Sequence, residues 1–207
     1  MKAIHLLKRL ERYPLFTEND VAKIVSKSPK YVRTLLYRLN RQGLIKRIER
    51  GKYTVHEDTL IFASRLATPS YLGLWTALRY HNMTQQQPLS FFVMTRSPKA
   101  NIRFNNAEIR FSSTKHMFGY EKQRYSDFDI FIADREKTII DALFFKLPLQ
   151  DVSQALDDEE IDLGKLTEYA KKVGNKSLIK RLGYLLECNK RDTDGLKPLD
   201  NNYVPLD

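Results

Sequence analysis

Two helix-start signals that follow each other closely in the first quarter of the chain constrain its fold most. Thr17 offers a hydroxyl oxygen as an N-cap, with Asp20 in the turn that follows, and Ser28 is followed at once by Pro29 at the first helical position. The pattern predicts helices over residues 2–12, 18–26 and 29–42, with Gly43 closing the third.

The segment after the third helix alternates apolar and polar residues around Arg50-Gly51, which predicts a β-hairpin over residues 44–55. Its inward-facing positions are expected to be Leu44, Ile48, Tyr53 and Val55. Three helices followed directly by a basic hairpin are the element order of a winged helix-turn-helix. We therefore predict that residues 1–56 form such a domain, here called the head.

The positive charge of the chain is concentrated in the head. Residues 1–56 hold 7 Lys and 7 Arg against 4 acidic residues, so their net charge of +10 equals that of the whole chain. The remaining 21 basic and 21 acidic residues cancel. A basic domain joined to a neutral one indicates that only the first binds a polyanion. A lysine-rich surface that merely aids solubility is the less favoured interpretation.

The third predicted helix has two unlike faces. Val32, Leu35, Leu36 and Leu39 have the spacing of a stripe that faces a core. The opposite face is basic and aromatic, which suits the major groove of double-stranded DNA, although an ordinary solvated face is the alternative. The candidates for base reading are Lys30, Tyr31, Arg33 and Thr34, and those for backbone contacts are Tyr37, Arg38 and Arg41.

The predicted hairpin adds a second basic group, consisting of Lys46, Arg47, Arg50 and Lys52. Wings of this kind lie along the minor groove or the DNA backbone, although one edge of this wing could instead contact the second domain. Arg33→Ala is expected to weaken specific-site binding by roughly 1–3 kcal/mol, and Lys52→Ala to weaken binding to all sequences alike.

The rest of the chain mixes helical and strand patterns, so the expected fold class is α+β. A mixed α/β domain, in which helices flank a small sheet, should follow the winged helix. We predict helices over residues 69–81, 135–146, 162–173 and 175–188, and strands over 89–95, 101–113 (a pair around Asn105-Asn106) and 128–134. The expected organisation is a head over 1–56, a partly helical linker over 57–68, a body over 69–189 and an extended tail over 190–207.

Residue types that mark common enzyme classes are scattered. His5, His56, His81 and His116 have no metal-ligand spacing, and the sequence has no Gly-rich phosphate loop or nucleophile elbow. The single Cys188 excludes an intramolecular disulfide and is expected to be a small buried residue. We therefore predict no catalytic residue, metal or cofactor. The lack of a signal peptide or a membrane-spanning apolar run favours a cytoplasmic location.

Acidic residues around the strand over 128–134 keep one enzyme class open. Asp127 and Asp129 can share one strand face, and Asp134 and Glu136 fall at the turn into the next helix. Nucleases build metal sites from such acids, but acids are also common at helix starts, and the latter interpretation is favoured. A DNA-targeted metal-dependent nuclease using Asp127, Asp129 or Glu136 and a regulator whose second domain binds a small effector remain the alternatives.

Several motifs of the second domain resemble those of the AbiEi antitoxin family. They are SYLGLWTALRYHNMTQQQP (70–88), Phe118-Gly119, ADREKTIID (133–141) and KRLGYLLE (180–187), and the ending Tyr203 to Asp207 is similar to a Leu-Asp-Pro ending in that family. The motifs occur in the family's order, and the resemblance covers essentially the whole chain. The chain departs from the pattern at Asp207, where many relatives continue.

The resemblance implies a transcriptional regulator that represses its own operon, usually at inverted repeats. It also implies a body that opposes a nucleotidyltransferase toxin of the AbiEii type in a type IV system, without a required stable complex between the two. DNA binding as a dimer or with cooperativity is left open. One candidate antitoxin surface is the stripe Arg181, Tyr184 and Glu187, although Arg181 could instead pair with an acid and Tyr184 could pack in the core.

Overall fold

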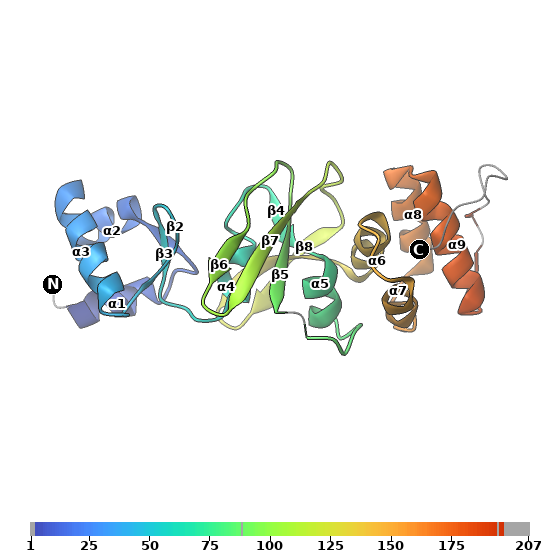
Figure 1. The fold of residues 1–207 in the computed structure, drawn as a ribbon, viewed down its shortest axis with the longest axis horizontal. Coiled ribbons are helices and arrows are strands. Elements are labelled where there is room, and N and C mark those ends of the chain that lie inside the picture. Colours follow the sequence, from blue (N-terminus) through green and yellow to red (C-terminus); the bar gives the residue numbers. More distant parts are fainter. Residues whose placement is uncertain (1–2, 88, 194, 197–207) are drawn as a thin grey trace.

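The computed structural model describes residues 3–87, 89–193 and 195–196. The molecule is elongated, and its head, a central mixed sheet and a group of helices follow one another along its length (Figure 1). Within the described residues, no helix is both long enough and apolar enough to cross a membrane. The Tyr203 to Asp207 ending and the predicted tail at 194 and 197–207 lie outside the described residues.

The head has the winged helix-turn-helix arrangement predicted from the sequence. It comprises α1 (Ala3–Leu10), β1 (Phe16–Thr17), α2 (Glu18–Val25), α3 (Pro29–Arg41), β2 (Lys46–Glu49) and β3 (Lys52–Thr54). The strands form an antiparallel sheet in the order β1-β3-β2. The helices and the sheet enclose a core of Leu6, Leu10, Phe16, Val21, Val32, Leu36, Leu39 and Ile45.

Both helix-start signals cap their helices as predicted. The Thr17 hydroxyl accepts the Asp20 N–H at 3.3 Å, and the Asp20 carboxylate accepts the Thr17 N–H at 2.8 Å, which completes a capping box for α2. The Ser28 hydroxyl accepts the Tyr31 N–H at 3.4 Å at the start of α3. After α3 the chain turns at Gly43 with φ at +71°, a conformation that glycine adopts without strain.

One inward position of the hairpin is predicted wrongly. Leu44 is 43% exposed, and its neighbour Ile45 is buried in its place. The Leu44 N–H donates to the Leu39 carbonyl at 3.0 Å, so Leu44 still belongs to the turn that closes α3. Strand β2 begins only at Lys46, so Leu44 lies outside the alternation, and Ile45 supplies the buried side chain just before the strand.

The central sheet has six strands in the order β6-β7-β5-β4-β9-β8. They are β4 (Ser70–Leu72), β5 (Ser90–Thr95), β6 (Ile102–Phe104), β7 (Ala107–Ser113), β8 (Tyr120–Tyr125) and β9 (Phe128–Ala133). The pairs β5–β7 and β4–β9 are parallel, and the other neighbours are antiparallel. Strands β5, β6, β7 and β9 match the predicted strand regions, whereas β4 and β8 are additional.

The single helix predicted over 69–81 is wrong in its first part. Ser70–Leu72 form the buried central strand β4, and helix α5 (Leu74–Tyr80) begins only after Gly73. A central strand is apolar on both faces, so it has no alternation that distinguishes it from a helix start. Gly73 is required where strand becomes helix, because a Cβ there would lie 2.5 Å from Met94 Cγ.

The remaining helices are α4 (Leu60–Ala63), α6 (Arg135–Phe144), α7 (Leu149–Ala155), α8 (Leu163–Val173) and α9 (Lys176–Cys188). Helix α6 lies between the sheet and the helices at the C-terminal end (Figure 1). The segment expected to be a linker contributes Phe62, Ala63 and Leu66 to the core of the sheet. Helix α7 was not predicted, and Cys188 is exposed rather than buried because it ends α9 on its outer side.

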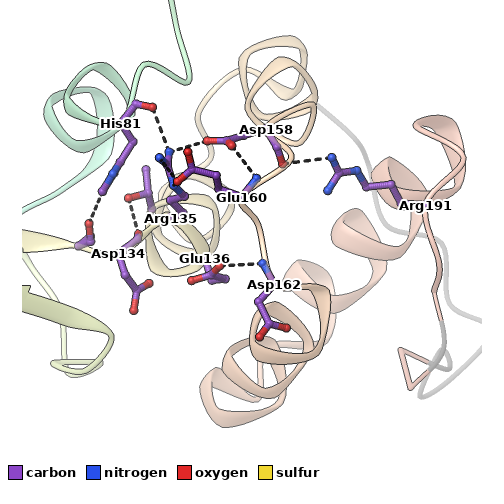
Figure 2. A network of polar contacts seen from close by, with 10 residues as sticks. His81, Asp134, Arg135, Glu136, Asp158, Glu160, Asp162 and Arg191 are labelled. Atoms are coloured by element: carbon purple, nitrogen blue, oxygen red, sulfur yellow. Dashed lines mark hydrogen bonds and ion pairs between the residues drawn. The ribbon is translucent and has the colours of Figure 1, made fainter.

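A polar network joins the helical end to the sheet (Figure 2). Arg135, at the start of α6, donates to the His81 carbonyl at 3.1 Å and to the carboxylates of Asp158 at 2.5 Å and Glu160 at 2.6 Å. Arg191 donates to the Asp158 carbonyl at 3.1 Å. One guanidinium therefore fixes the end of α5, the start of α6 and the loop before α8 together.

Candidate nucleic-acid interface

The outer face of α3 is the candidate nucleic-acid interface. Val32, Leu36 and Leu39 are buried in the head and Leu35 packs against the same core, so the opposite face of α3 points outward. All seven predicted contact residues on this helix are exposed, namely Lys30, Tyr31, Arg33, Thr34, Tyr37, Arg38 and Arg41. Helix α3 lies on the side of the head away from the central sheet (Figure 1), so the structure leaves this face open to a duplex.

Two tyrosines on this face are unusually open for large side chains. Tyr37 is 63% exposed and Tyr31 is 51% exposed. Tyr31 also lines a shallow pocket of about 360 Å³ with Lys30, Thr34 and Arg38. Phenol, hydroxyl, ammonium and guanidinium groups on one rigid helix are the donors that bind phosphate oxygens and base edges.

Arg33 has an intramolecular partner at the edge of this face. Its Nε donates to Glu18 Oε2 at 2.9 Å, while the Arg33 side chain remains 70% exposed. Exposed ion pairs contribute at most about 1 kcal/mol to stability. A guanine edge or a phosphate can therefore replace Glu18, which meanwhile keeps the Arg33 guanidinium beside α2.

The four predicted wing residues divide into two kinds. Arg47 and Arg50 are exposed, and the Arg47 side chain donates to the Glu49 carbonyl at 3.3 Å. In contrast, the Lys52 ammonium donates to the Leu66 carbonyl at 2.8 Å, and the Lys46 ammonium bonds Glu57 and Asn105. Contacts of Lys46 and Lys52 with DNA therefore stay predictions. Each ammonium group would have to leave its present partners in order to reach DNA.

The wing rests on the body through Glu49 and Ile48. Glu49 pairs with Lys99 at 2.7 Å and with Lys52 at 2.9 Å, and Ile48 belongs to the core of the central sheet. Burial alone would raise the pKa of the Glu49 carboxyl, but the two lysines outweigh it and lower that pKa. Sequence reasoning left this contact open as an alternative, because it depends on residues about 50 positions apart.

The acidic residues considered for a nuclease do not converge. Asp127 is exposed in the turn between β8 and β9, and Asp129 pairs with two basic residues of β8. Asp134 caps α6 and Glu136 is buried, and both pair with Lys165. At about 3.3 Å per strand residue, Asp129 and Asp134 are separated by roughly 16 Å. The described residues include no group of three or more His, Cys, Asp or Glu placed to hold a metal ion.

A buried polar cluster in the body was not predicted. The Lys137 ammonium donates to Asp141 and, at 2.9 Å, to the Tyr71 hydroxyl, which donates to Asp141 at 2.8 Å. Burial raises the pKa of Asp141 and Tyr71 and lowers the pKa of Lys137. The i,i+4 spacing of Lys137 and Asp141 in a helix was the available signal. The cluster fixes β4 to α6.

The candidate antitoxin stripe on α9 is only partly at the surface. Tyr184 is 46% exposed and Glu187 is exposed, whereas Arg181 is 6% exposed. Arg181 lies next to Leu182 and one turn before Leu185, on the face of α9 that packs into the helical core. A surface built on this helix therefore includes Tyr184 and Glu187 but not Arg181.

Comparison with known families bears on the segment that carries α3 and the wing. A family model described as "Transcriptional regulator, AbiEi antitoxin" matches residues 5–56. The head matches the AbiEi antitoxin family. The AbiEi match begins within α1 and ends just after β3, so it contains all eleven predicted DNA-contact residues and none of the body. No curated protein is significantly similar to the chain.

Proposed function

We propose that the protein is a sequence-specific DNA-binding repressor of its own operon and the antitoxin of a type IV toxin–antitoxin system. The observation that carries this proposal is the open basic and aromatic face of α3 within the AbiEi match. The head also holds the entire net charge of the chain, which favours binding to a polyanion.

In the proposed complex, α3 lies in the major groove. Arg33 exchanges Glu18 for a base edge, while Tyr37, Arg38 and Arg41 contact the backbone. The exposed edge of the wing adds Arg47 and Arg50. Two copies on an inverted repeat would read half-sites whose centres lie about 34–36 Å, or one helical turn, apart.

The proposed role of the body is to oppose a nucleotidyltransferase toxin in the cytoplasm without forming a stable complex with it. The match of the head to a family described as antitoxins supports this role. On α9, Tyr184 and Glu187 are the proposed surface residues, since both are exposed and one turn apart.

Binding of two labelled duplexes tests the repressor proposal. One duplex carries the promoter region of the protein's own operon, and the other has a scrambled sequence. Arg33→Ala should weaken promoter binding by roughly 1–3 kcal/mol and leave scrambled binding nearly unchanged, because a base contact is lost. Arg96→Ala, at an exposed arginine of the body, is the control. Equal affinity of the wild type for both duplexes would contradict sequence-specific repression.

Co-expression tests the antitoxin proposal separately. The chain is expressed with a nucleotidyltransferase encoded next to its gene, and growth is measured for Tyr184→Ala, Glu187→Lys and Arg33→Ala. Protection should survive Arg33→Ala, because the head is proposed to act on DNA and the body on the toxin's effect. Failure of the wild type to restore growth would refute the antitoxin role while leaving the repressor role intact. If both surface variants protect fully, another part of the body is responsible.

A further inference from the structure

A pocket with aromatic walls lies in the body, where α5, the start of β5 and the β8–β9 hairpin meet. It has a volume of about 510 Å³, and its rings are Trp75 and Tyr80 of α5, Phe91 of β5 and Tyr125 of β8. We call it the aromatic pocket. Its volume lies in the range of small-molecule sites, which combine apolar walls with a few polar groups.

The rings of the aromatic pocket have faces available for a ligand. Trp75, Phe91 and Tyr125 are only partly buried, and among the described residues none of the three stacks on another aromatic ring. Aromatic side chains gain stability from offset or edge contacts with further rings. An open set of rings around one space therefore fits a planar aromatic molecule.

One cation at the pocket is largely uncommitted. Arg79 follows Trp75 by one helical turn, lines the same pocket and is exposed. Its guanidinium makes one long hydrogen bond, to the Gln86 carbonyl at 3.5 Å, and forms no ion pair within the described part of the chain. A guanidinium presents paired donors that fit a phosphate or carboxylate group.

The acidic residue at the pocket is, in contrast, already satisfied. Asp58 accepts the Leu60 N–H at 2.9 Å and the Tyr125 hydroxyl at 2.7 Å. The bond to Asp58 raises the pKa of Tyr125 to about 12, so this phenol stays a donor and its ring is held in place. Asp58 keeps its negative charge, but both of its carboxylate oxygens already accept hydrogen bonds, whereas the Arg79 guanidinium has donors left for an anionic group.

We propose that the aromatic pocket binds a small molecule that joins a planar aromatic ring to an anionic group, of the class of the nucleoside monophosphates. The base stacks on Trp75 and packs against Phe91 and Tyr125, and the phosphate pairs with Arg79. The proposal is independent of the DNA-binding role, since the pocket lies outside both the head and the AbiEi match.

The chain contains a single tryptophan, and it lies in this pocket, so its fluorescence reports binding directly. The full chain is titrated with AMP, GMP, CMP and UMP, with the four nucleosides, and with inorganic phosphate, using excitation at a wavelength that nucleotides do not absorb. At least one monophosphate should cause a saturable change. Its nucleoside should bind about tenfold or more weakly, because the charged hydrogen bonds are lost, and phosphate alone should cause no change.

Two variants distinguish a specific binding site from non-specific electrostatic attraction. Arg79→Gln should weaken the monophosphate to the affinity of its nucleoside and leave the nucleoside unchanged. Arg96→Gln, at an exposed arginine outside the pocket, should affect neither. Calorimetry with the same ligands repeats the measurement without fluorescence, and circular dichroism checks that each variant is folded. The proposal is overturned if no monophosphate binds by either method, or if both arginine variants weaken binding equally.

Discussion

Lys137, Asp141 and Tyr71 are less than 3% exposed, and each satisfies the others' hydrogen-bonding needs. A charge in such surroundings is tolerable only while its partner remains, because both have lost their hydration. The three residues therefore differ from ordinary apolar core residues. Removing one of them leaves another buried polar group without its hydrogen-bond partner, which lowers the stability of the fold.

We expect Asp141→Asn to lower the free energy of unfolding by about 3–5 kcal/mol, because it leaves the Lys137 ammonium buried without a counter-charge. Tyr71→Phe should cost less, about 1.5–3 kcal/mol, because it removes a neutral hydroxyl that donates to Asp141 and accepts from Lys137 but leaves the ion pair in place. Urea denaturation followed by circular dichroism measures both. The double variant Lys137→Met/Asp141→Leu should recover much of the loss, and a double variant no more stable than Asp141→Asn would argue against this account.

His81 makes the stability of the body depend on pH. Its ring Nε2 lies 2.7 Å from the Ala133 carbonyl oxygen, and burial lowers its pKa below the usual 6.5. The unfolded chain then binds the proton more tightly than the folded chain, so this contribution to stability is present above pH 6.5 and is lost as pH falls below that value. Unfolding free energies at pH 7.5 and 5.5 should differ more for the wild type than for His81→Gln, and an equal difference would contradict the role of His81.

At the scale of elements, the β2–β3 wing faces two directions. Its outer edge carries Arg47 and Arg50, while Glu49 and Lys52 bind the body. The Asn40 side chain accepts the Arg47 N–H at 3.1 Å, so the wing is also fixed to α3. The hairpin therefore connects α3 to the body through side-chain contacts on both sides.

This division changes what wing substitutions should do to DNA binding. Arg50→Ala should weaken binding to all duplexes about equally and reduce the salt dependence by about one phosphate contact. Lys52→Ala should affect affinity less, because its ammonium is held by Leu66 and Glu49, and should instead increase amide exchange in residues 46–54. Affinity measured over a salt series distinguishes the two. A larger loss of DNA affinity for Lys52→Ala than for Arg50→Ala would contradict this division and favour a direct contact of Lys52 with DNA.

At the scale of the whole molecule, the head and the body are joined by side chains as well as by the chain itself. Lys99 of the body pairs with Glu49, Lys46 of the wing bonds Asn105, and Phe62, Ala63 and Leu66 pack in the core of the sheet. The elongated shape in Figure 1 is therefore held by specific contacts between its parts.

Removal of the Glu49 charge should loosen the contact between the head and the body without separating them, because the burial of Ile48 and the Lys46–Asn105 hydrogen bond remain. In Glu49→Gln, amide hydrogen exchange of residues 46–54 should become faster, whereas Lys122→Met, which alters an exposed pair elsewhere, should leave it unchanged. The lowered pKa of Glu49 means that the ionic contact exists above the usual glutamate pKa of 4.5 and is lost as pH falls through the lower value. Equal exchange rates in both variants would contradict this role of Glu49.

The sequence predicted the head well because its signals are local. The caps at Thr17 and Ser28 and the spacing of Val32, Leu36 and Leu39 act within one or two helical turns. The exposed face of α3 follows from the same spacing. These features need no knowledge of the rest of the chain.

The body was predicted less completely because its organisation depends on distant residues. Strand β4 is buried by neighbours on both sides and lacks alternation, while β8 is an edge strand with charged residues. The Lys46–Asn105 and Glu49–Lys99 contacts join segments about 50 to 60 residues apart, and the burial of Arg181 follows from tertiary packing of α9. No local pattern encodes such contacts.

The packed segment over residues 60–66 has a consequence for promoter architecture. Many paired DNA-binding proteins tolerate changes in operator spacing because a slack tether lets each reading helix find its own half-site. Here Phe62, Ala63 and Leu66 are buried in the core of the body, so the segment that connects the head to the body is held in place. If two copies bind an inverted repeat through contacts between their bodies, as an extension of the proposed function, operators should differ in spacing by whole helical turns, and inserting half a turn between repeats should abolish joint occupancy.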